Sequence, residues 1–306
     1  MADLSLVSSA AVPPPLGCRY TVRGRGLAAY RCGSGAPAVI FLPGAGLVGL
    51  DYLNLQRRIA RLTSTLAYDR AGTGWSDPVA LPRGAGDVVR ELRELLAVAE
   101  VSGPYLLVGH SLGGAYARRF AQLFAGETCG LVLLDPFHED LHLHAPREVR
   151  EQLEAMHRRE IPQPTVDQLR AGRHAARCLF ASWPDQVREA LIEHHVTAAW
   201  RAGLQEDRNL YDEVAGELRR GTDLPDVPLI VLTALGADDT QTALWGCEVS
   251  RAINDGKATL HAELAASVPR GEQRILHSAG HGWLHEQRQD DVLAAINEII
   301  GTVRHG

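Results

Sequence analysis

The sequence predicts an α/β protein with a doubly wound, mostly parallel sheet and an inserted helical cap. Continuous apolar runs such as 38–42 and 131–134 are typical of strands covered on both faces, and they alternate with stretches of helical periodicity. After Asp135 the strand pattern disappears for about 90 residues, and charged helical stretches replace it. It returns at 228–233. One sheet is therefore expected to continue on both sides of the insertion.

The expected elements follow in chain order. Residues 18–22 and 27–32 are strand-like runs around Gly24-Arg25-Gly26, which is typical of a hairpin. Besides the apolar runs above, strands are expected at 66–68, 105–108 and 273–277. Apolar residues at helical spacing predict helices over 52–62, 88–99, 112–124 and 290–303. Within the insertion, the helical stretches are 146–159, 183–201 and 209–220.

These elements divide the chain into three parts. Residues 1–17 are expected to be a flexible N-terminus, 18–136 and 226–306 the α/β core, and 137–225 the helical cap. The N-terminus has no basic start and runs into Pro13-Pro14-Pro15, which argues against a signal peptide.

Composition excludes several classes of protein. The 306 residues carry a net charge of −6 with a pI near 6.1 and no dense basic stripe, so no nucleic-acid partner is expected. The five cysteines form no Cys-x-x-Cys pair, which indicates neither a disulfide framework nor a zinc site. No apolar run reaches the roughly 20 residues of a membrane helix. We therefore expect a cytoplasmic protein without a membrane span.

The central motif is Gly109-His110-Ser111-Leu112-Gly113, which has the pattern G-x-S-x-G between an expected strand and an expected helix. This setting is typical of a nucleophile elbow, in which a tight turn lifts the serine hydroxyl clear of the sheet. Both flanking glycines are needed because side chains there would clash with the neighbouring strand and helix. The alternative is a glycine-rich loop with a solvated serine. Ser111 is the candidate nucleophile.

A serine nucleophile needs a base, and His281 is the candidate. It lies just past the last expected strand between Gly280 and Gly282, where the loop allows an imidazole to reach over the sheet edge. An ordinary loop histidine is the alternative. His285 follows, but no H-E-x-x-H pattern is present, so no metal is expected there.

Two backbone amides are candidates to bind an oxyanion. The first is the amide of Leu112, directly after the nucleophile, at the start of a helix. The second is the amide of Ala45, in the loop Pro43-Gly44-Ala45-Gly46 after the strand 38–42, where glycines let the backbone approach a reacting carbonyl.

These motifs resemble the α/β-hydrolase superfamily and occur in its order. The matching segments are 41–44, 68–77 (Tyr-Asp-Arg-Ala-Gly-Thr-Gly-Trp-Ser-Asp), 109–114, 131–135 and 280–281. The resemblance covers residues 27–135 and 225–303 and implies a cap over the active site, a Ser/acid/His triad and a mechanism without a cofactor. One position departs from the pattern: Pro43 stands where many members have histidine.

The resemblance leaves two candidates for the triad acid. Family order places it after the strand 228–233, where Asp239 is available with Asp238 beside it. Some relatives place it after the preceding strand, which here is Asp135. Residues 243–255 look like an insertion that widens the distance in sequence from Asp239 to His281. Asp135 is the first choice, although it could instead cap backbone amides at a strand end.

The sequence thus predicts a serine hydrolase that cleaves a carboxylic ester or thioester, with a small-molecule acyl substrate and with no metal or cofactor. Acyl transfer, C–C hydrolysis or lyase chemistry on the same triad, and a ligand-binding sensor, are the alternatives. The polar residues His138, Glu139, Asp140, His142 and His144 are expected to line the entrance rather than to bind a metal. Trp183, Trp200 and Trp245 are candidates for a pocket wall or for the core of the cap.

Overall fold

The structure is a computed structural model that describes residues 13–144, 163–236 and 239–305, together with residues 146, 147, 150, 151, 155 and 161. Within the range 239–245 it describes the backbone only. Residues 1–12 of the expected flexible N-terminus and most of the helix expected at 146–159 lie outside the described residues.

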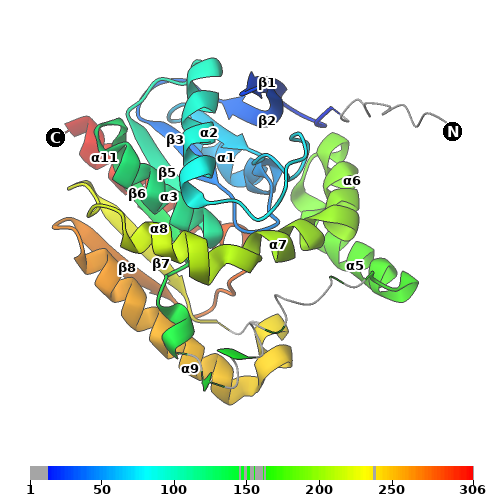
Figure 1. The fold of residues 1–306 in the computed structure, drawn as a ribbon. Coiled ribbons are helices and arrows are strands. Elements are labelled where there is room, and N and C mark those ends of the chain that lie inside the picture. Colours follow the sequence, from blue (N-terminus) through cyan, green and yellow to red (C-terminus); the bar gives the residue numbers. More distant parts are fainter. Residues whose placement is uncertain are drawn as a thin grey trace, which may run out of the picture.

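The sheet has eight strands in the order β1-β2-β4-β3-β5-β6-β7-β8 (Figure 1). The strands are β1 (Cys18–Val22), β2 (Arg25–Cys32), β3 (Ala38–Leu42), β4 (Thr65–Tyr68), β5 (Tyr105–His110), β6 (Thr128–Leu134), β7 (Leu229–Ala234) and β8 (Gly271–Leu276). The β1–β2 and β2–β4 pairs are antiparallel, and all the other pairs are parallel. Both the predicted hairpin and the predicted continuation of one sheet across the insertion are confirmed.

Helices cover both faces of this sheet. The helices outside the insertion are α1 (Leu53–Ile59), α2 (Ala85–Val98), α3 (Leu112–Leu123), α9 (Asp239–Ala266), α10 (Leu284–Gln287) and α11 (Gln289–His305). One layer of the core joins α2, α3 and α9 to the sheet, and the other joins α1 and α11 (Figure 1). Every residue of β3, β5 and β7 is buried, as expected for strands covered on both faces. The predicted doubly wound α/β class is confirmed.

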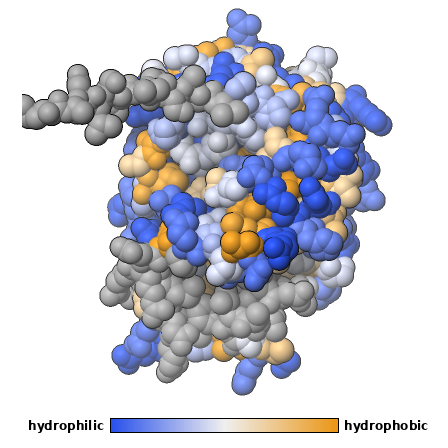
Figure 2. Space-filling model, turned by 90° about the vertical axis from the view of Figure 1, so that its right-hand side faces the viewer, coloured by the Kyte–Doolittle hydropathy of each residue, from blue (hydrophilic) through white to orange (hydrophobic). Residues whose placement is uncertain are grey.

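All the secondary structure that the structure describes between β6 and β7 is helical. Its helices are η3 (Leu141–His144), α5 (Val166–Leu179), η4 (Phe180–Ser182), α6 (Asp185–His194), η5 (His195–Ala199), α7 (Trp200–Glu206), η6 (Asp207–Asn209), η7 (Leu210–Val214) and α8 (Ala215–Arg219). The face that carries α5 and α6 is mainly hydrophilic, with hydrophobic residues in small separate groups (Figure 2).

This helical segment packs directly on the loop after β3. A Cβ atom added to Gly46, whose φ is +70°, would lie 2.5 Å from the carbonyl oxygen of Ala199. The backbones therefore approach each other as closely as glycine permits. Trp183 is buried and donates from its indole nitrogen to the Leu50 carbonyl oxygen at 2.9 Å. These contacts fix η5 and α7 above the carboxyl end of the sheet.

The largest difference from the sequence prediction lies between β7 and β8. Residues 243–255, expected as an insertion in a loop, belong to the 28-residue helix α9, which is interrupted by a kink at Gly246 with φ 77°. Its buried face contains polar residues, Lys257 and His261, beside Leu260 and Leu264. Because polar residues occupy that face, the apolar periodicity of the helix is weak.

We find no helix among the described residues that is long and apolar enough to cross a membrane. The cytoplasmic location stays a prediction from the sequence.

Candidate active site

Ser111 occupies the turn between β5 and α3 with φ 52° and ψ −121°, a backbone conformation that side-chain-bearing residues rarely adopt. A Cβ atom on Gly113 would lie 1.9 Å from the Leu42 carbonyl oxygen, and one on Gly109 would lie 2.4 Å from the Gly113 carbonyl oxygen. The two glycines of the motif are therefore required by close backbone packing. The predicted strand–turn–helix setting is present.

His281 lies in the loop between β8 and α10 and connects Ser111 to Asp135. Its Nε2 is 3.0 Å from Ser111 Oγ, and its Nδ1 is 2.6 Å from Asp135 Oδ2. An ionised carboxylate only accepts hydrogen bonds, so Nδ1–H donates to Asp135 and Nε2 is free to accept from the serine hydroxyl. The three residues follow three different strands. His281 is 170 positions from Ser111 and 146 positions from Asp135 in the sequence.

Asp135 follows β6 with a positive φ of 44° and a fully buried side chain. Its Oδ1 accepts from the Ala234 amide at 2.9 Å, and its Oδ2 accepts from Lys257 Nζ at 2.9 Å as well as from His281. Burial by itself would raise the pKa of Asp135, but the charge of Lys257 and the hydrogen bond from His281 hold that pKa well below its usual value. Asp135 is therefore ionised at neutral pH.

His261 stands behind Asp135 on the same face of α9 as Lys257. Its Nε2–H donates to the Pro136 carbonyl oxygen at 2.9 Å, and its Nδ1 accepts from Thr233 Oγ1 at 3.0 Å. Burial lowers the pKa of His261 to about 4, so the ring is neutral at neutral pH. Lys257 is then the cation that balances the charge of Asp135.

The two candidate oxyanion amides lie beside Ser111. Leu112 is the first residue of α3, and Ala45 lines the same cavity as Ser111. A Cβ atom on Gly44 would lie 3.3 Å from Ser111 Cβ, so the loop after β3 contacts the elbow. Within the described part of the chain, neither amide has a hydrogen-bond acceptor. Both are thus available to a ligand.

A buried ion pair holds the Ala45 loop in place. Arg70 donates to the carbonyl oxygens of Pro43 and Gly44 at 2.7 and 2.8 Å. It also forms two hydrogen bonds to Glu206 of α7, at 2.8 and 2.9 Å, and Glu206 accepts from the Gly46 amide at 2.8 Å. Burial would lower the pKa of Arg70, but Glu206 raises it above its usual value. The pair joins the helical segment to the loop that carries Ala45.

Ser111 opens onto a cavity of about 370 Å³. Its lining comprises Gly44, Ala45, Gly46, Leu47, His110, Ser111, His195, Ala199, Trp200, Asp207, His281, Gly282 and Trp283. The carboxyl ends of the core strands and the helical segment therefore enclose it together, which is the arrangement expected of a binding site.

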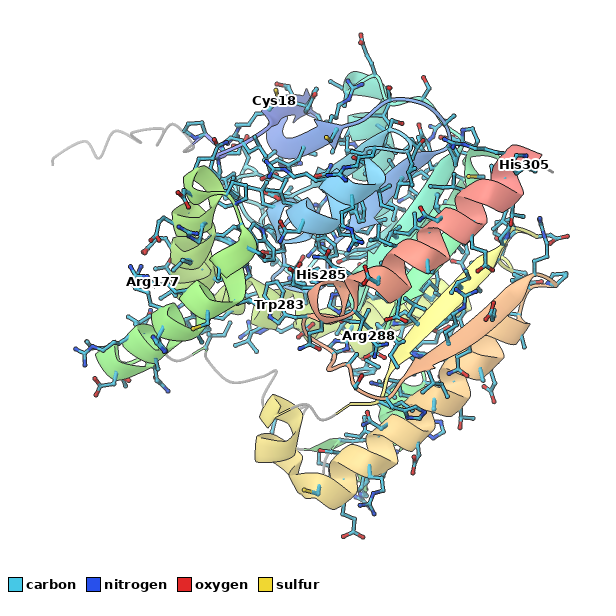
Figure 3. The ribbon with its side chains drawn as sticks, turned by 180° about the vertical axis from the view of Figure 1, so that it is seen from behind. Cys18, Arg177, Trp283, His285, Arg288 and His305 are labelled. Carbon is cyan, nitrogen blue, oxygen red and sulfur yellow. The ribbon has the colours of Figure 1, made fainter. Side chains whose placement is uncertain are left out.

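His110 and Trp283 line this cavity, and the rings of both contact His285. His110 donates from Nε2 to the His281 carbonyl oxygen at 2.8 Å, and burial lowers the pKa of His110 to about 4. This neutral ring fixes the backbone of the loop that carries the candidate base. His285 is fully buried and stacks on Tyr52 with ring centroids 4.1 Å apart. Figure 3 shows Trp283 and His285 between the helical segment and the start of α11.

Other residues singled out from the sequence have different surroundings. Asp239 begins α9, but its side chain lies outside the described residues, as does Asp238. Glu139 pairs with Arg118 and Asp140 with Arg219. Among the described residues, no three His, Cys, Asp or Glu side chains are grouped as a metal would require. Of the tryptophans, Trp183 is a core residue and Trp200 lines the cavity, while the side chain of Trp245 lies outside the described residues.

Sequence analysis did not single out Arg70, Glu206, Asp207 and Lys257 as site residues. Lys257 carries a signal in the sequence, because it is the single lysine in a chain with 30 arginines, and Arg70 lies in the segment 68–77 that carries the family resemblance. No local pattern marks Glu206 or Asp207, which lie on the helical segment.

Comparison with known proteins identifies the family. The sequence pattern of the alpha/beta hydrolase family matches residues 39–295. The chain belongs to the alpha/beta hydrolase family.

Its relatives with curated sequences match over short segments. An uncharacterized protein of Schizosaccharomyces pombe is 45% identical over 73 residues, which are 24% of this chain and 14% of that protein. The uncharacterized protein YqjL of Bacillus subtilis is 36% identical over 107 residues, 35% of this chain and 42% of that protein. The chain thus spans less than half the length of either relative.

Solved structures resemble the chain over nearly its whole length. An esterase from Exiguobacterium antarcticum has a TM-score of 0.60 at 14% identity, covering 93% of this chain and 99% of that one. A meta-cleavage product hydrolase from Pseudomonas fluorescens IP01 has a TM-score of 0.63 at 14% identity, covering 94% and 98%. At such identity the likeness shows the shared fold.

Proposed function

We propose that this chain is a serine hydrolase that cleaves a carboxylic ester or thioester through an acyl-enzyme on Ser111. The observation that carries the proposal is the continuous hydrogen-bonded series from Ser111 Oγ through His281 to Asp135, which opens onto the cavity beside two free amides. Nucleophile, base and orienting carboxylate are the three parts that serine catalysis needs.

The reaction begins with attack of Ser111 Oγ on the substrate carbonyl carbon while the hydroxyl proton moves to His281 Nε2. The carbonyl oxygen becomes an oxyanion and accepts hydrogen bonds from the amides of Leu112 and Ala45. The C–O or C–S bond then breaks, and His281 gives its proton to the leaving alcohol or thiol. Water, deprotonated by His281, attacks the acyl-enzyme and releases the acid and the serine. Asp135 keeps the Nδ1–H tautomer and stabilises the imidazolium without taking the proton.

Fold alone does not select this reaction, because acyl transfer and C–C bond hydrolysis use the same residues in other members of the superfamily. Ester or thioester hydrolysis is proposed because a serine, its base and two amide donors are sufficient for it with water as the only further reactant, whereas acyl transfer also needs a bound acceptor. A ligand-binding sensor would bind at the same cavity without turnover.

An organophosphonate probe and an activated ester test the proposal. We expect stoichiometric labelling of Ser111 and a burst of 4-nitrophenol from 4-nitrophenyl acetate. Ser111→Ala and His281→Ala should each lower kcat/KM by at least about a thousandfold while circular dichroism stays unchanged. Ser102→Ala, at an exposed loop serine, is the matched control and should retain activity.

Labelling without turnover of any ester or thioester would favour the sensor, and product transferred to an added alcohol in preference to water would favour an acyltransferase. Substantial turnover by Ser111→Ala would contradict the assignment of the nucleophile.

A further inference from the structure

The cavity beside Ser111 contains a carboxyl group for which the described residues supply no hydrogen bond and no ion pair. Asp207, the first residue of η6, lines this cavity together with Ser111 and His281. Its carboxyl group is close enough to His281 for the two side chains to interact electrostatically. Among the residues that the structure describes, Asp207 makes no hydrogen bond and no ion pair. Glu206, the preceding residue, has its carboxylate fully engaged by Arg70 and the Gly46 amide.

The other carboxylates around the cavity are paired. Glu206 is paired with Arg70, Asp135 with Lys257, and Asp51 accepts a hydrogen bond from His195 at 2.8 Å. Asp207 therefore has no ion pair among the described residues, although the charges of His281 and Arg70 act on it. Burial and repulsion by Glu206 outweigh those two charges and raise the pKa of Asp207 to about 7.

Aromatic rings line the same cavity. Trp200 and Trp283 both contribute to its wall. The guanidinium of Arg201 lies 5.0 Å from the centre of the Trp200 ring and occupies one face of this indole. A carboxylate that the described residues leave without an ion pair, together with indole rings, is a combination that binds alkylammonium groups.

We propose that Asp207 selects substrates that carry an ammonium group, with the cation held by the Asp207 carboxylate and the indole rings of Trp200 and Trp283 while the acyl carbonyl lies at Ser111. This inference rests on the proposed ester hydrolysis and adds its substrate class, cationic carboxylic esters.

Pairs of esters that differ only in charge test this inference. Acetylcholine is compared with 3,3-dimethylbutyl acetate, and the 4-nitrophenyl ester of trimethylammonioacetate with that of 3,3-dimethylbutanoate, so that the cation is offered on either side of the carbonyl. For each ester, kcat/KM is divided by the rate constant of its uncatalysed hydrolysis, because the ammonium group by itself activates the neighbouring carbonyl. In at least one pair, this normalised value for the cationic ester should exceed that for its neutral counterpart by about tenfold or more. A ratio near one in both pairs overturns the inference.

Variants assign the preference to Asp207. Asp207→Asn should reduce the ratio to within about twofold of one. Asp212→Asn, at an exposed position on the next turn of the same segment, is the matched control and should keep the ratio. A ratio that survives Asp207→Asn, or one that Asp212→Asn also abolishes, overturns the inference.

A measurement on the unaltered protein removes any dependence on how well a variant folds. Choline should compete with the neutral ester at least about tenfold more strongly than 3,3-dimethylbutan-1-ol, and equal inhibition overturns the inference. The two hypotheses fail in different ways. Loss of Ser111 labelling and of all ester turnover would defeat the proposed function, whereas turnover of neutral esters without a cationic preference would defeat only this inference.

The buried ammonium group of Lys257 carries a second inference independently. Lys257 is 8% exposed and donates to Asp135 Oδ2 and to the Ala234 carbonyl oxygen. His281 Nδ1 binds the same oxygen, Asp135 Oδ2. The carboxylate of Asp135 therefore binds both the imidazole of His281, the candidate base, and the ammonium group of Lys257.

The groups that face Asp135 and His281 can be named for each neighbouring element. Helix α9 presents Lys257 and His261, β5 presents His110, and the helical segment presents Asp207. His110 and His261 are neutral at neutral pH because burial lowers the pKa of each to about 4. Lys257 is the cation in this set, and it opposes the appearance of positive charge on His281.

We propose that Lys257 is a positioning residue that offsets the charge of Asp135 and thereby extends the activity of the Ser111–His281 pair to lower pH. Lys257 Nζ and His281 Nδ1 are at most about 5.5 Å apart, since both contact one oxygen, at 2.9 and 2.6 Å.

The pH profile of kcat/KM on 4-nitrophenyl acetate tests this role. Lys257→Met and Lys257→Gln should both move the acid limb of the profile to higher pH by more than about 0.3 units, since the positive charge beside Asp135 is gone. Lys257→Arg keeps the charge and should leave the limb within about 0.3 units. Arg251→Met removes an exposed cation from the same helix and is the matched control.

An acid limb that stays in place in both neutral variants overturns this inference, even if their activity falls. A merely structural role would lower kcat in all three Lys257 variants without moving the limb.

Discussion

The buried pair of Arg70 and Glu206 allows the attachment of the Ala45 loop to be tested quantitatively. The two side chains are 1% and 3% exposed, and two hydrogen bonds join them. Glu206→Gln leaves the guanidinium buried without its counter-charge, and breaking a buried ion pair in this way costs about 3–5 kcal/mol. With an unfolding entropy of about 2.1 cal/mol/K per residue, a chain of 306 residues loses about 1.6 °C in Tm per kcal/mol. Glu206→Gln should therefore lower Tm by about 5–8 °C.

Differential scanning calorimetry at pH 7 measures this change, with kcat on an activated ester followed in parallel. We expect kcat to fall by about tenfold as well, because the loop that carries the Ala45 amide loses one of its attachments. Glu127→Gln is the matched control, since Glu127 pairs with Arg93 on the surface at 2.7 Å and such pairs are worth at most about 1 kcal/mol. A Glu206→Gln protein that melts no lower than Glu127→Gln would refute the argument that charge pairing holds this loop.

Three further predictions follow from individual residues. Gly113→Ala should destabilise the fold by about 3 kcal/mol in urea unfolding, because its Cβ would lie 1.9 Å from a carbonyl oxygen, whereas Gly126→Ala, with open space around it, should change stability by less than about 0.5 kcal/mol. Asp135→Asn should lower kcat by about 10⁴, and Asp239→Asn by less than about threefold; the reverse order would move the acid role to Asp239. The pKa of Asp207 is raised to about 7, so the folded state binds this proton more tightly than the unfolded state and its ionisation opposes folding as the pH rises. Asp207→Asn should accordingly raise Tm by about 3 °C at pH 8, for a gain of about 2 kcal/mol, and leave Tm unchanged at pH 4; an equal Tm at pH 8 would contradict this reasoning.

Local patterns were sufficient for the strands that carry the candidate site. Strands β3 and β6 end where their continuous apolar runs end, and β5 continues two residues past its run, to His110. The helix following Ser111 was likewise predicted over nearly its observed length. Helix α9 was missed because its buried face includes Gly256, Lys257 and His261, so the apolar period that reveals a helix is masked by polar residues.

Sequence analysis placed Asp135 ahead of Asp239 as the triad acid, but no local pattern excluded Asp239. Asp135 follows β6 and Asp239 follows β7, and these two strands are parallel neighbours. Both residues therefore lie at the carboxyl edge of the sheet, where the loop that carries His281 also begins after β8. The structure brings Asp135 to within 2.6 Å of His281, and the positive φ of Asp135 turns its side chain back over the end of its strand. No sequence rule specifies such a backbone turn for an aspartate.

By itself the sequence determined the class of sheet, the elbow at Ser111 and the candidate base at His281, because apolar periodicity and glycine placement act over a few neighbouring residues. Only the tertiary structure decided what surrounds them. Arg70 meets Glu206 across 136 positions, Asp135 meets Lys257 across 122, and Asp207 has no hydrogen bond or ion pair with the part of the chain that the structure describes. Charge pairing depends on distance in space and on burial, which residue spacing does not encode, so the balance of charge at the site became visible only in the folded chain.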